Sequence, residues 1–531
     1  MSRIRPRLRV ILAAGAISVL AAGCTAPTLT GHGRTGVSPA APGAPATSAA
    51  TVPPTPAQPL AQFADCRSAI DVNALGLPTQ RAAKLSFGCA RIDVPLNYAD
   101  PTGKKISLVL LRIHDSDNTA HTGSLLVNPG GPGGSGVNLA LGILGNVSDA
   151  LLTHFDLIGF DPRGVGLSTP IKCLSDAEKD RMNALSPDVL TPAGFALAQR
   201  TASKVANACN ATYGKDLAQY NTVQTARDMD QIRQAVGDSK MNYLGFSYGT
   251  ELGAQYIHLF PHNVRAAVLD GAVDPLTNDI TTFANQVKGF EDAFDQFATW
   301  CDEHSPCRDL GNPRRAVHDI AARASRSPLR SSQPGETRTA TSSIVYTGVL
   351  SALYSQSEWQ SLGQALLDAR NGDAAGLFRL ADSYNERFNG HYTNIADANL
   401  TISCNDSKPG PSDATIRQTA LSWAKRFPLF GVWNADGLFS CQPWQPVRTI
   451  PPLPTAPNTP HKILVVGNLH DPATPYQGAK DLARTLGNAQ LLTWDGEGHT
   501  SYLQGSSCVD HAVDNYLITL SVPAAGTTCP R

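Results

Sequence analysis

The sequence carries little charge. Only 16% of its 531 residues are charged, and 43 basic residues against 44 acidic ones leave a formal net charge of −1. This balance argues against a strongly cationic nucleic-acid-binding protein, because affinity for the phosphate backbone requires an excess of lysine and arginine. A disordered, highly charged scaffold is also disfavoured, since 42% hydrophobic residues are ample for a buried core. Nucleic acid is therefore not an expected partner.

The N-terminal region lacks an apolar run long enough to cross a membrane. Four arginines between positions 3 and 9 precede an apolar stretch at 10–20, whereas a transmembrane helix needs about 20 residues. This pattern is typical of a secretory signal peptide, which we place at residues 1–23. The Ala-Ala-Gly-Cys ending resembles a bacterial lipobox, in which acylated Cys24 would attach the exported chain to a membrane surface. The alternative is ordinary cleavage beside an incidental cysteine.

Residues 24–60 lack the apolar side chains that a folded segment needs. Eight prolines lie among alanine, threonine and serine at 25–60, where Arg34 is the only charged residue. Such a stretch buries too little surface to offset its ordering entropy. We predict an extended, disordered tether between a lipid anchor and a folded domain.

Cysteine pairs with C-x-x-C spacing are absent, so the sequence gives no support for a zinc ribbon or a thioredoxin-type site. Ten cysteines remain when Cys24 is set aside, and an even number in an exported chain favours disulfides. They fall into successive close pairs, which suggests sequential bridging, for example of Cys66 with Cys89 and of Cys301 with Cys307. The sequence alone does not select one connectivity.

From residue 88 onward, short apolar runs alternate with helical patterns. The expected strands are rich in valine, isoleucine and leucine and lie at 90–94, 106–113, 124–127, 155–160, 242–245 and 266–269. Residues 222–236 carry apolar side chains at helical spacing. Strands of this composition separated by helices predict an α/β fold with a mainly parallel sheet.

The alternation breaks after residue 275. The following segment is mostly helical in pattern, for example at 349–353, 359–369 and 374–384, and strands resume at 462–466 and 490–493. A helical block that interrupts an α/β sheet is typical of an inserted cap. We therefore predict a core domain at 61–275, a helical cap at 276–445 and the rest of the core at 446–531.

The motif Gly-Phe-Ser-Tyr-Gly at 245–249 is the sharpest functional signal. It fits G-x-S-x-G, follows an apolar strand and opens a helix expected at 250–259. In that context the serine lies on a strained strand-to-helix turn that exposes its hydroxyl, and the helix N-terminus adds backbone donors for a developing negative charge. Ser247 is therefore the candidate nucleophile.

A glycine-rich loop at 128–136 follows another strand. Its glycines can bring a backbone N–H close to a reacting carbonyl and so complete an oxyanion hole with the N–H of Tyr248. Pro132 has no N–H, so we place the second donor on Gly131, with Gly130 as the fallback. A phosphate-binding loop is a weak alternative because the P-loop lysine and the following Ser or Thr are missing. A plain flexible loop remains the other alternative.

The acid and the base should follow the serine in the order acid, then histidine. Asp471 and His499 each lie a few residues beyond an expected strand, where the catalytic residues of α/β enzymes gather. His499 would take the proton of Ser247, and Asp471 would fix the imidazole tautomer. The rival acids are Asp270, Asp495 and Glu497. His470, adjacent to the favoured acid, is interpreted as a rim residue.

Together these motifs resemble the secreted actinomycete tripeptidyl aminopeptidases over about residues 61–531. The segments that carry the resemblance are 127–136, 160–168, 243–250, 268–275, 471–475 and 496–499. The resemblance implies an α/β-hydrolase serine peptidase, related to proline iminopeptidases, with a helical cap over the site. It carries the triad over to Ser247, Asp471 and His499. The family also includes envelope members with esterase activity, so the substrate does not follow from the fold.

An exopeptidase must recognise a free α-amino group, and a carboxylate in the cap is the physical means. Asp406 lies in the predicted cap close to Cys404, which we expect to form a disulfide, and the family resemblance includes this stretch. Glu251, four residues after the nucleophile, is the second candidate. The alternative for each is a solvated or structural carboxylate.

The sequence thus predicts an exported serine exopeptidase that acts on peptide or protein substrates and needs no metal or organic cofactor. A cell-envelope esterase or lipase with the same catalytic groups is the alternative, and a deep apolar pocket without a cap carboxylate would favour it. A catalytically silent envelope binding protein is a third hypothesis. The intact Ser, Asp and His argue against it, because packing does not require all three at strand ends.

Overall fold

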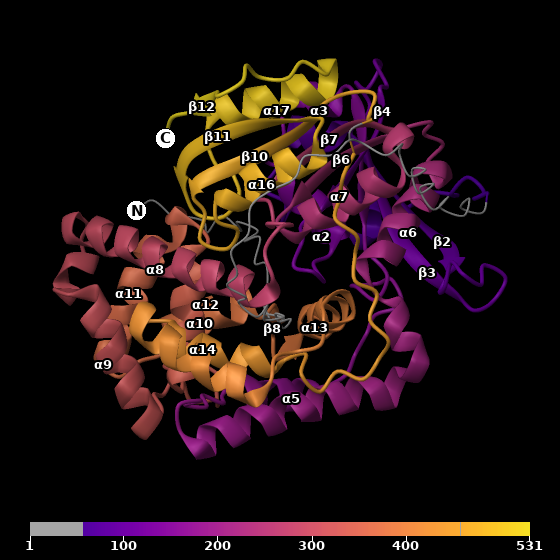
Figure 1. The fold of residues 1–531 in the computed structure, drawn as a ribbon. Helices are drawn as coiled ribbons and strands as arrows, with labels where there is room; N and C mark the ends of the chain where they lie inside the picture. Colours follow the sequence, from indigo (N-terminus) through magenta and orange to yellow (C-terminus); the bar gives the residue numbers. More distant parts are fainter. Residues whose placement is uncertain (1–56, 457) are drawn as a thin grey trace, which may run out of the picture.

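The computed structural model describes residues 57–456 and 458–531, so the expected leader, Cys24 and most of the tether lie outside the described residues. A ten-stranded sheet in the order β1-β2-β3-β5-β4-β6-β7-β10-β11-β12 lies in the upper part of the molecule as drawn in Figure 1. Its strands are β1 (Ala64–Asp65), β2 (Leu85–Pro95), β3 (Lys105–Asp115), β4 (Gly123–Asn128), β5 (Phe155–Phe160), β6 (Met241–Phe246), β7 (Val264–Asp270), β10 (Ile463–His470), β11 (Ala489–Glu497) and β12 (Thr528–Cys529).

Most of the sheet is parallel, which confirms the expected fold class. The pairs β1–β2, β2–β3 and β3–β5 are antiparallel, and every other pair from β5 to β12 is parallel. All eight strands expected from the sequence are present. β10 and β11 extend further than expected, to His470 and Glu497. This extension puts the carboxyl ends of both strands beside the loops that carry the candidate acid and base.

Both faces of the sheet are covered at its centre: neighbouring residues of a strand point to opposite sides, and every residue of β4, β5 and β6 is buried. Leu125 packs in one apolar cluster with α2 (Gly136–Ile143) and α17 (Ser507–Thr519). Leu126 packs in another with α6 (Thr222–Ala235), α7 (Tyr248–Leu259) and α16 (Gln477–Leu486). Helix α6 begins where Asn221 accepts a hydrogen bond from the backbone of Gln224, and its apolar residues recur at helical spacing as predicted.

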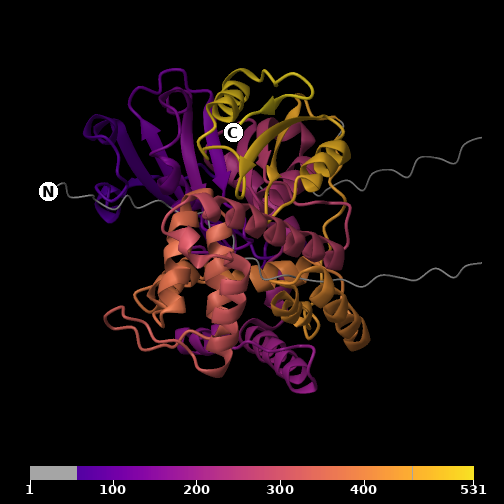
Figure 2. The ribbon, with the colours of Figure 1, turned by 90° about the vertical axis from the view of Figure 1, so that its left-hand side faces the viewer.

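A separate block of helices lies below the sheet and the helices that cover it, as seen in Figures 1 and 2. Its helices are α8 (Asp279–Glu303), α9 (Pro313–Arg326), α10 (Ser342–Leu353), α11 (Trp359–Arg370), α12 (Ala375–Tyr384), α13 (Ile395–Asp406), α14 (Asp413–Arg426) and α15 (Gly431–Asn434). All of them except α13 share an apolar core of their own, built around residues such as Phe294, Val349 and Phe430, whereas Ala398 and Ile402 of α13 pack with the core beside the sheet. This block corresponds to the proposed cap at 276–445.

Helix α5 (Pro192–Tyr213) also packs on this block, although it lies in the first part of the proposed core domain. Phe195 and Ala198 of α5 are buried in the core of the block, and the Phe195 ring meets that of Phe439 edge-on at 4.7 Å. The helical layer is therefore made from two excursions of the chain, one after β5 and one after β7.

The ten cysteines of the described region form five disulfides, which confirms the suggested sequential bridging. The pairs are Cys66–Cys89, Cys173–Cys209, Cys301–Cys307, Cys404–Cys441 and Cys508–Cys529. Disulfides form and persist in oxidising compartments, so the protein is an exported one. Within residues 57–456 and 458–531, no helix combines the length and apolarity that a membrane span requires.

Two of these disulfides provide a matched test of how the helical block is stabilised. Cys404–Cys441 closes a loop of 37 residues and Cys301–Cys307 one of 6, and all four cysteines are buried. Chain-entropy arguments predict that Cys404→Ala/Cys441→Ala lowers the free energy of unfolding by about 1.6 kcal/mol more than Cys301→Ala/Cys307→Ala. Guanidinium titration of both double variants measures the difference. Equal losses would show that loop closure does not govern stability here.

Candidate active site

Ser247 is the single residue between β6 and α7. Its φ of 56° lies in the left-handed region, which only a tightly constrained non-glycine residue adopts. The motif glycines make this turn possible, since a Cβ on Gly245 would lie 2.4 Å from the carbonyl oxygen of Gly249. The sequence-predicted strand–serine–helix junction is therefore present, with Ser247 at the N-terminus of α7.

Asp471 and His499 form a buried hydrogen-bonded pair. The Nδ1 atom of His499 lies 2.8 and 3.0 Å from the two carboxylate oxygens of Asp471, and both side chains are almost fully buried. The same carboxylate accepts backbone N–H groups from Ala473, Thr474 and Thr500. Asp471 thus fixes the imidazole and the backbone that follows it.

The other ring nitrogen of His499, Nε2, is available to accept a proton. This atom is buried and has no hydrogen-bond partner within the described part of the chain. Ser247 and His499 both lie next to the segment Asp270-Gly271. The N–H of Ser247 donates to the carbonyl of Asp270 (2.9 Å), and a Cβ on Gly271 would lie 3.3 Å from Cε1 of His499. Ser247 Oγ and Nε2 do not form a hydrogen bond in the structure, and catalytic hydrogen bonds commonly tighten only around the substrate.

The helical block holds the loops of the acid and the base. The backbone N–H of His499 donates to the carbonyl of Tyr354 at the end of α10 (2.8 Å), and the two rings meet edge-on at 5.4 Å. On α8, Gln286 donates to the carbonyl of Ala473 (3.1 Å). Also on α8, Gly289 lies so close to the Asp471 loop that a Cβ would be 2.4 Å from the Pro472 carbonyl oxygen. Cap residues therefore take part in positioning the site.

The rival acids face other partners. Asp270 is fully buried, and its carboxylate accepts the backbone N–H groups of Ser501 (3.0 Å) and Tyr502 (2.7 Å), just after the base. Asp495 contacts His470 at the rim (3.2 Å), and Glu497 pairs with the C-terminal Arg531 (2.6 Å). The geometry agrees with the preference for Asp471. It also assigns Asp270 a supporting position that the sequence pattern did not indicate.

The oxyanion loop favours Gly131 over Gly130. The N–H of Gly130 already donates to the side chain of Asn128 (2.9 Å). Within residues 57–456 and 458–531, neither Gly131 N–H nor Tyr248 N–H has an acceptor, and both residues line the same cavity as Ser247. Position 130 nevertheless requires glycine, because the Cβ of any other residue would lie 2.9 Å from the backbone nitrogen of Tyr248.

The cavity in front of Ser247 has a volume of about 530 Å³, and it is lined by four carboxylic acids and one basic residue: Glu251, Asp274, Asp279, Asp406 and Lys408. Burial, together with nearby Asp279, raises the pKa of Glu251 to about 7, and burial raises that of Asp279 to about 6. Burial and then Glu251 raise the pKa of Asp406 well above its ordinary value. Lys408 and Arg448 partly compensate Asp279, whereas no basic side chain of the described region compensates Glu251, so Glu251 is suited to binding a cation.

The two acids expected from the sequence differ in their contacts. Asp406 accepts the N–H and the hydroxyl of Thr222 at the start of α6, and this hydroxyl also contacts the Tyr248 hydroxyl. Glu251 has no hydrogen bond or ion pair in the described region. Asp279 was missed by sequence reasoning. The available signal was a helix start, Asn278-Asp279, soon after the Asp274-Pro275 break where the cap begins.

Asp270 should make the protein less stable as the pH rises. Burial raises its pKa to about 7, so the stability that comes from its neutral form is complete below the unfolded pKa and is lost as the pH rises through 7. Between pH 5 and pH 8 this loss is about 2–3 kcal/mol. The free energy of unfolding of Asp270→Asn should therefore fall by about 2–3 kcal/mol less than that of the parent protein between pH 5 and pH 8. Calorimetric unfolding of both proteins at the two pH values measures it, and identical pH slopes would contradict the assignment.

Several known proteins are similar to this chain over most of its length. A sequence model described as the alpha/beta hydrolase fold matches residues 123–506. Serine protease Hip1 of Mycobacterium tuberculosis is 38% identical over 466 residues, covering 83% of this chain and 87% of that protein. Carboxylesterase B of the same organism is 36% identical over 459 residues, covering 83% and 86%. Tripeptidyl aminopeptidase of Streptomyces coelicolor is 32% identical over 456 residues, covering 83% and 82%, and this confirms the resemblance seen in the sequence. The chain belongs to the alpha/beta hydrolase family.

Proposed function

We propose that this serine peptidase removes short peptides from the free N-termini of its substrates. The observation that carries the proposal is that Glu251, which has no hydrogen bond or ion pair in the described region, shares one cavity with Ser247, the candidate oxyanion donors and three further carboxylic acids. A carboxylate is the natural partner of an α-ammonium group. The relatives named as a serine protease and a tripeptidyl aminopeptidase support the same conclusion.

The catalytic steps follow from the geometry around Ser247. Its Oγ attacks the scissile carbonyl carbon while His499 Nε2 takes the hydroxyl proton, and Asp471 stabilises the imidazolium. The N–H groups of Gly131 and Tyr248 donate to the oxyanion. His499 then gives the proton to the leaving amine, and an ester between Ser247 and the N-terminal fragment remains. Water, deprotonated by His499, hydrolyses this acyl-enzyme and releases the fragment.

Glu251 is the best-placed group to bind the substrate ammonium. It lies one helical turn after Ser247 on α7 and has no competing partner in the described region, whereas Asp406 is already engaged by Thr222. A bound ammonium would stabilise the ionised form of Glu251 and bring its pKa down from about 7. Asp279 and Asp406 add negative charge to the same cavity. The distance between this ammonium site and Ser247 would set how many residues are removed.

An esterase is the second candidate, since carboxylesterase B is also a relative. That function would suit a deep apolar cavity. The acids in front of Ser247 favour a cationic substrate end instead, because an apolar ester would leave Glu251 without a partner. A silent binding protein is disfavoured, since the pair of Asp471 and His499 leaves a free buried nitrogen that serves no packing purpose.

We also propose that acylated Cys24 holds the exported enzyme at the outer face of a membrane. This rests on the sequence Ala-Ala-Gly-Cys after a signal-like segment, and on the proline-rich stretch that would separate the anchor from the catalytic domain. A membrane-surface peptidase would meet envelope and extracellular peptides as substrates.

The aminopeptidase proposal predicts that a free N-terminus is required. Tripeptide amides with a free α-amino group should be cleaved at least tenfold more efficiently than their acetylated counterparts, because acetylation removes the ammonium charge. Ser247→Ala should abolish both activities. Measuring kcat/KM for each pair of substrates tests this. Equal cleavage of free and acetylated peptides would contradict the aminopeptidase reading, and cleavage by Ser247→Ala would contradict the serine mechanism.

Two isosteric variants separate ammonium binding from support of the oxyanion hole. Glu251→Gln should raise KM for free-amine peptides about 10–100-fold, the worth of a charge-assisted hydrogen bond, and leave N-terminal hydroxyl analogues nearly unchanged. Asp406→Asn should lower kcat for both substrate types, because Asp406 holds Thr222 and through it Tyr248. Steady-state kinetics on both variants give the split between KM and kcat. An unchanged KM in Glu251→Gln would remove Glu251 from the ammonium site.

A further inference from the structure

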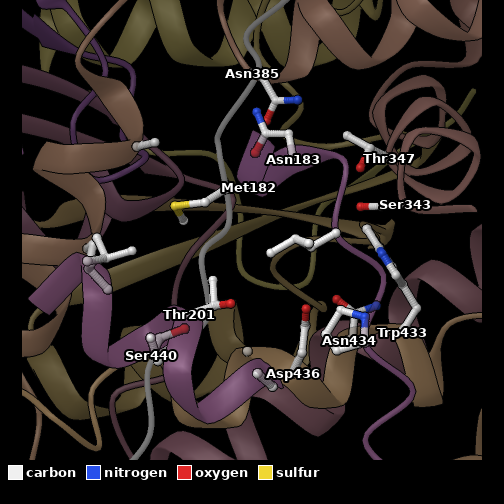
Figure 3. A pocket seen from close by; sticks show the side chains of 18 of the residues that line it. Met182, Asn183, Thr201, Ser343, Thr347, Asn385, Trp433, Asn434, Asp436 and Ser440 are labelled. Atoms are coloured by element: carbon white, nitrogen blue, oxygen red, sulfur yellow. The ribbon is translucent and has the colours of Figure 1, made fainter. Parts of the chain in front are cut away.

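A second cavity, of about 280 Å³, lies inside the helical block, away from Ser247 (Figure 3). It is lined by residues of α5, α8, α10, α13, the helix α4 (Asp176–Asn183) and the 3₁₀-helix η6 (Ala435–Phe439). Phe283, Val287 and Phe290 of α8 form much of its apolar wall. Gln286, on the same helix, lines both this cavity and the one in front of Ser247.

The charges in this cavity do not cancel. Lys179 and Asp397 face each other at 2.7 Å with both side chains buried, so they form a neutral pair. Asp436 is the remaining charged group, and its carboxyl accepts only the backbone N–H groups of Gly437 and of Asp436 itself. In the part of the chain that the structure describes, no side chain forms a hydrogen bond or an ion pair with Asp436. One carboxyl is therefore left without a counter-ion.

The remaining polar side chains do not compensate for Asp436. Figure 3 shows the Asp436 side chain in the cavity, across from the amides of Asn183 and Asn385. The phenols Tyr384 and Tyr392 also line the cavity, and neither carries a positive charge. Burial raises the pKa of Asp436 to about 7, so a cation in the cavity would complete its ionisation.

We propose that this cavity binds an organic cation, an ammonium or a guanidinium on a short apolar stem, with Asp436 as its counter-ion. The aromatic wall would cover the stem, and aromatic faces attract a cation as well. A neutral apolar ligand would leave Asp436 unpaired, and an anion would be repelled by it. The volume of about 280 Å³ is just below the usual range for pockets that hold a whole small-molecule ligand, which suits a group of side-chain size.

Two sources can supply this chemistry. One is a basic side chain of the peptide substrate, which rests on the proposed peptidase function, and the other is a free aliphatic amine. The shared residue Gln286 favours the peptide, because a chain bound at Ser247 that crosses Gln286 would reach the second cavity. The Gln286 amide is itself fixed by its hydrogen bond to Ala473 in the acid loop.

Binding is tested on the full-length Ser247→Ala protein, so that the result does not depend on turnover. Calorimetric titrations would compare Nα-acetyl-lysine amide with Nα-acetyl-norleucine amide, and hexylamine with hexanol. Each pair matches the apolar stem and differs mainly in the charge, and the acetyl group removes the α-ammonium. We expect the charged member of at least one pair to bind about tenfold more tightly. Equal binding within both pairs would overturn the proposal.

Two further substitutions locate the site. The preference for charge should disappear in Asp436→Asn and persist in Asp436→Glu and in Glu251→Gln. A preference lost in Glu251→Gln but kept in Asp436→Asn would place the cation in front of Ser247 and overturn the proposal. Should Asp436→Asn fail to fold, the Glu251→Gln protein still decides between the two cavities. Because no step needs hydrolysis, failure of the peptidase function would leave this result standing.

The active enzyme distinguishes the two sources. Free-amine tripeptide amides with lysine or norleucine at each position in turn should show, at one position, about a tenfold higher kcat/KM for lysine that Asp436→Asn removes. That outcome assigns the cavity to a substrate side chain. Tight hexylamine binding without any lysine preference in hydrolysis assigns it to free amines. Both results support the cation site.

Discussion

The buried carboxylate of Asp471 is the group on which the site depends. A charge without solvent costs several kcal/mol unless it is fully paired. Asp471 meets this condition through backbone N–H groups of its own loop, the hydroxyl of Thr474, the N–H of Thr500 and the ring of His499. Those donors come from two loops at the ends of β10 and β11. The carboxylate therefore ties the two loops together, and the orientation of His499 follows from that connection.

The two cavities contrast with this fully satisfied centre. Burial raises the pKa of three carboxyl groups in these cavities: Glu251 and Asp279 in front of Ser247, and Asp436 in the helical block. Such groups lower the stability of the folded chain at neutral pH, so their retention is more easily understood through binding than through folding. The same physical condition, a carboxyl without a counter-ion in a cavity, occurs on both sides of Gln286.

The parts of the fold that local pattern determines could be predicted from the sequence. The buried strands, helix α6 and the Ser247 turn follow from short-range periodicity and from glycines, and the expected strand positions were correct. β10 and β11 were predicted too short, because their last residues are polar, and β10 is irregular between Asn468 and His470. The choice of Gly131 as the candidate oxyanion donor came from the missing N–H of Pro132, and in the structure the alternative, the N–H of Gly130, donates to Asn128.

What depends on long-range packing could not be predicted. The contact of Asp406 with Thr222 spans 184 residues, and nothing in either local sequence indicates it. The same is true of α5 in the helical layer and of Tyr354 against His499. The place of Asp279 in the cavity depends on where α8 begins relative to Ser247. The sequence could supply the chemistry of each group, whereas the pairing of groups required the fold.

These long-range contacts change how the cap should be understood. The carbonyl of Tyr354 accepts the backbone N–H of His499. Helix α8 packs directly against the backbone of Pro472 at Gly289, where any side chain would clash. A cap that swung open as a rigid lid would break the contacts that orient the base and its acid. Substrate should therefore reach Ser247 through the cavity beside α8 while these contacts persist. Catalysis requires reacting groups to stay within a few tenths of an ångström of their productive geometry. Changes in the cap would consequently alter kcat as well as KM, because the helices that select the substrate are the same ones that hold the catalytic loops.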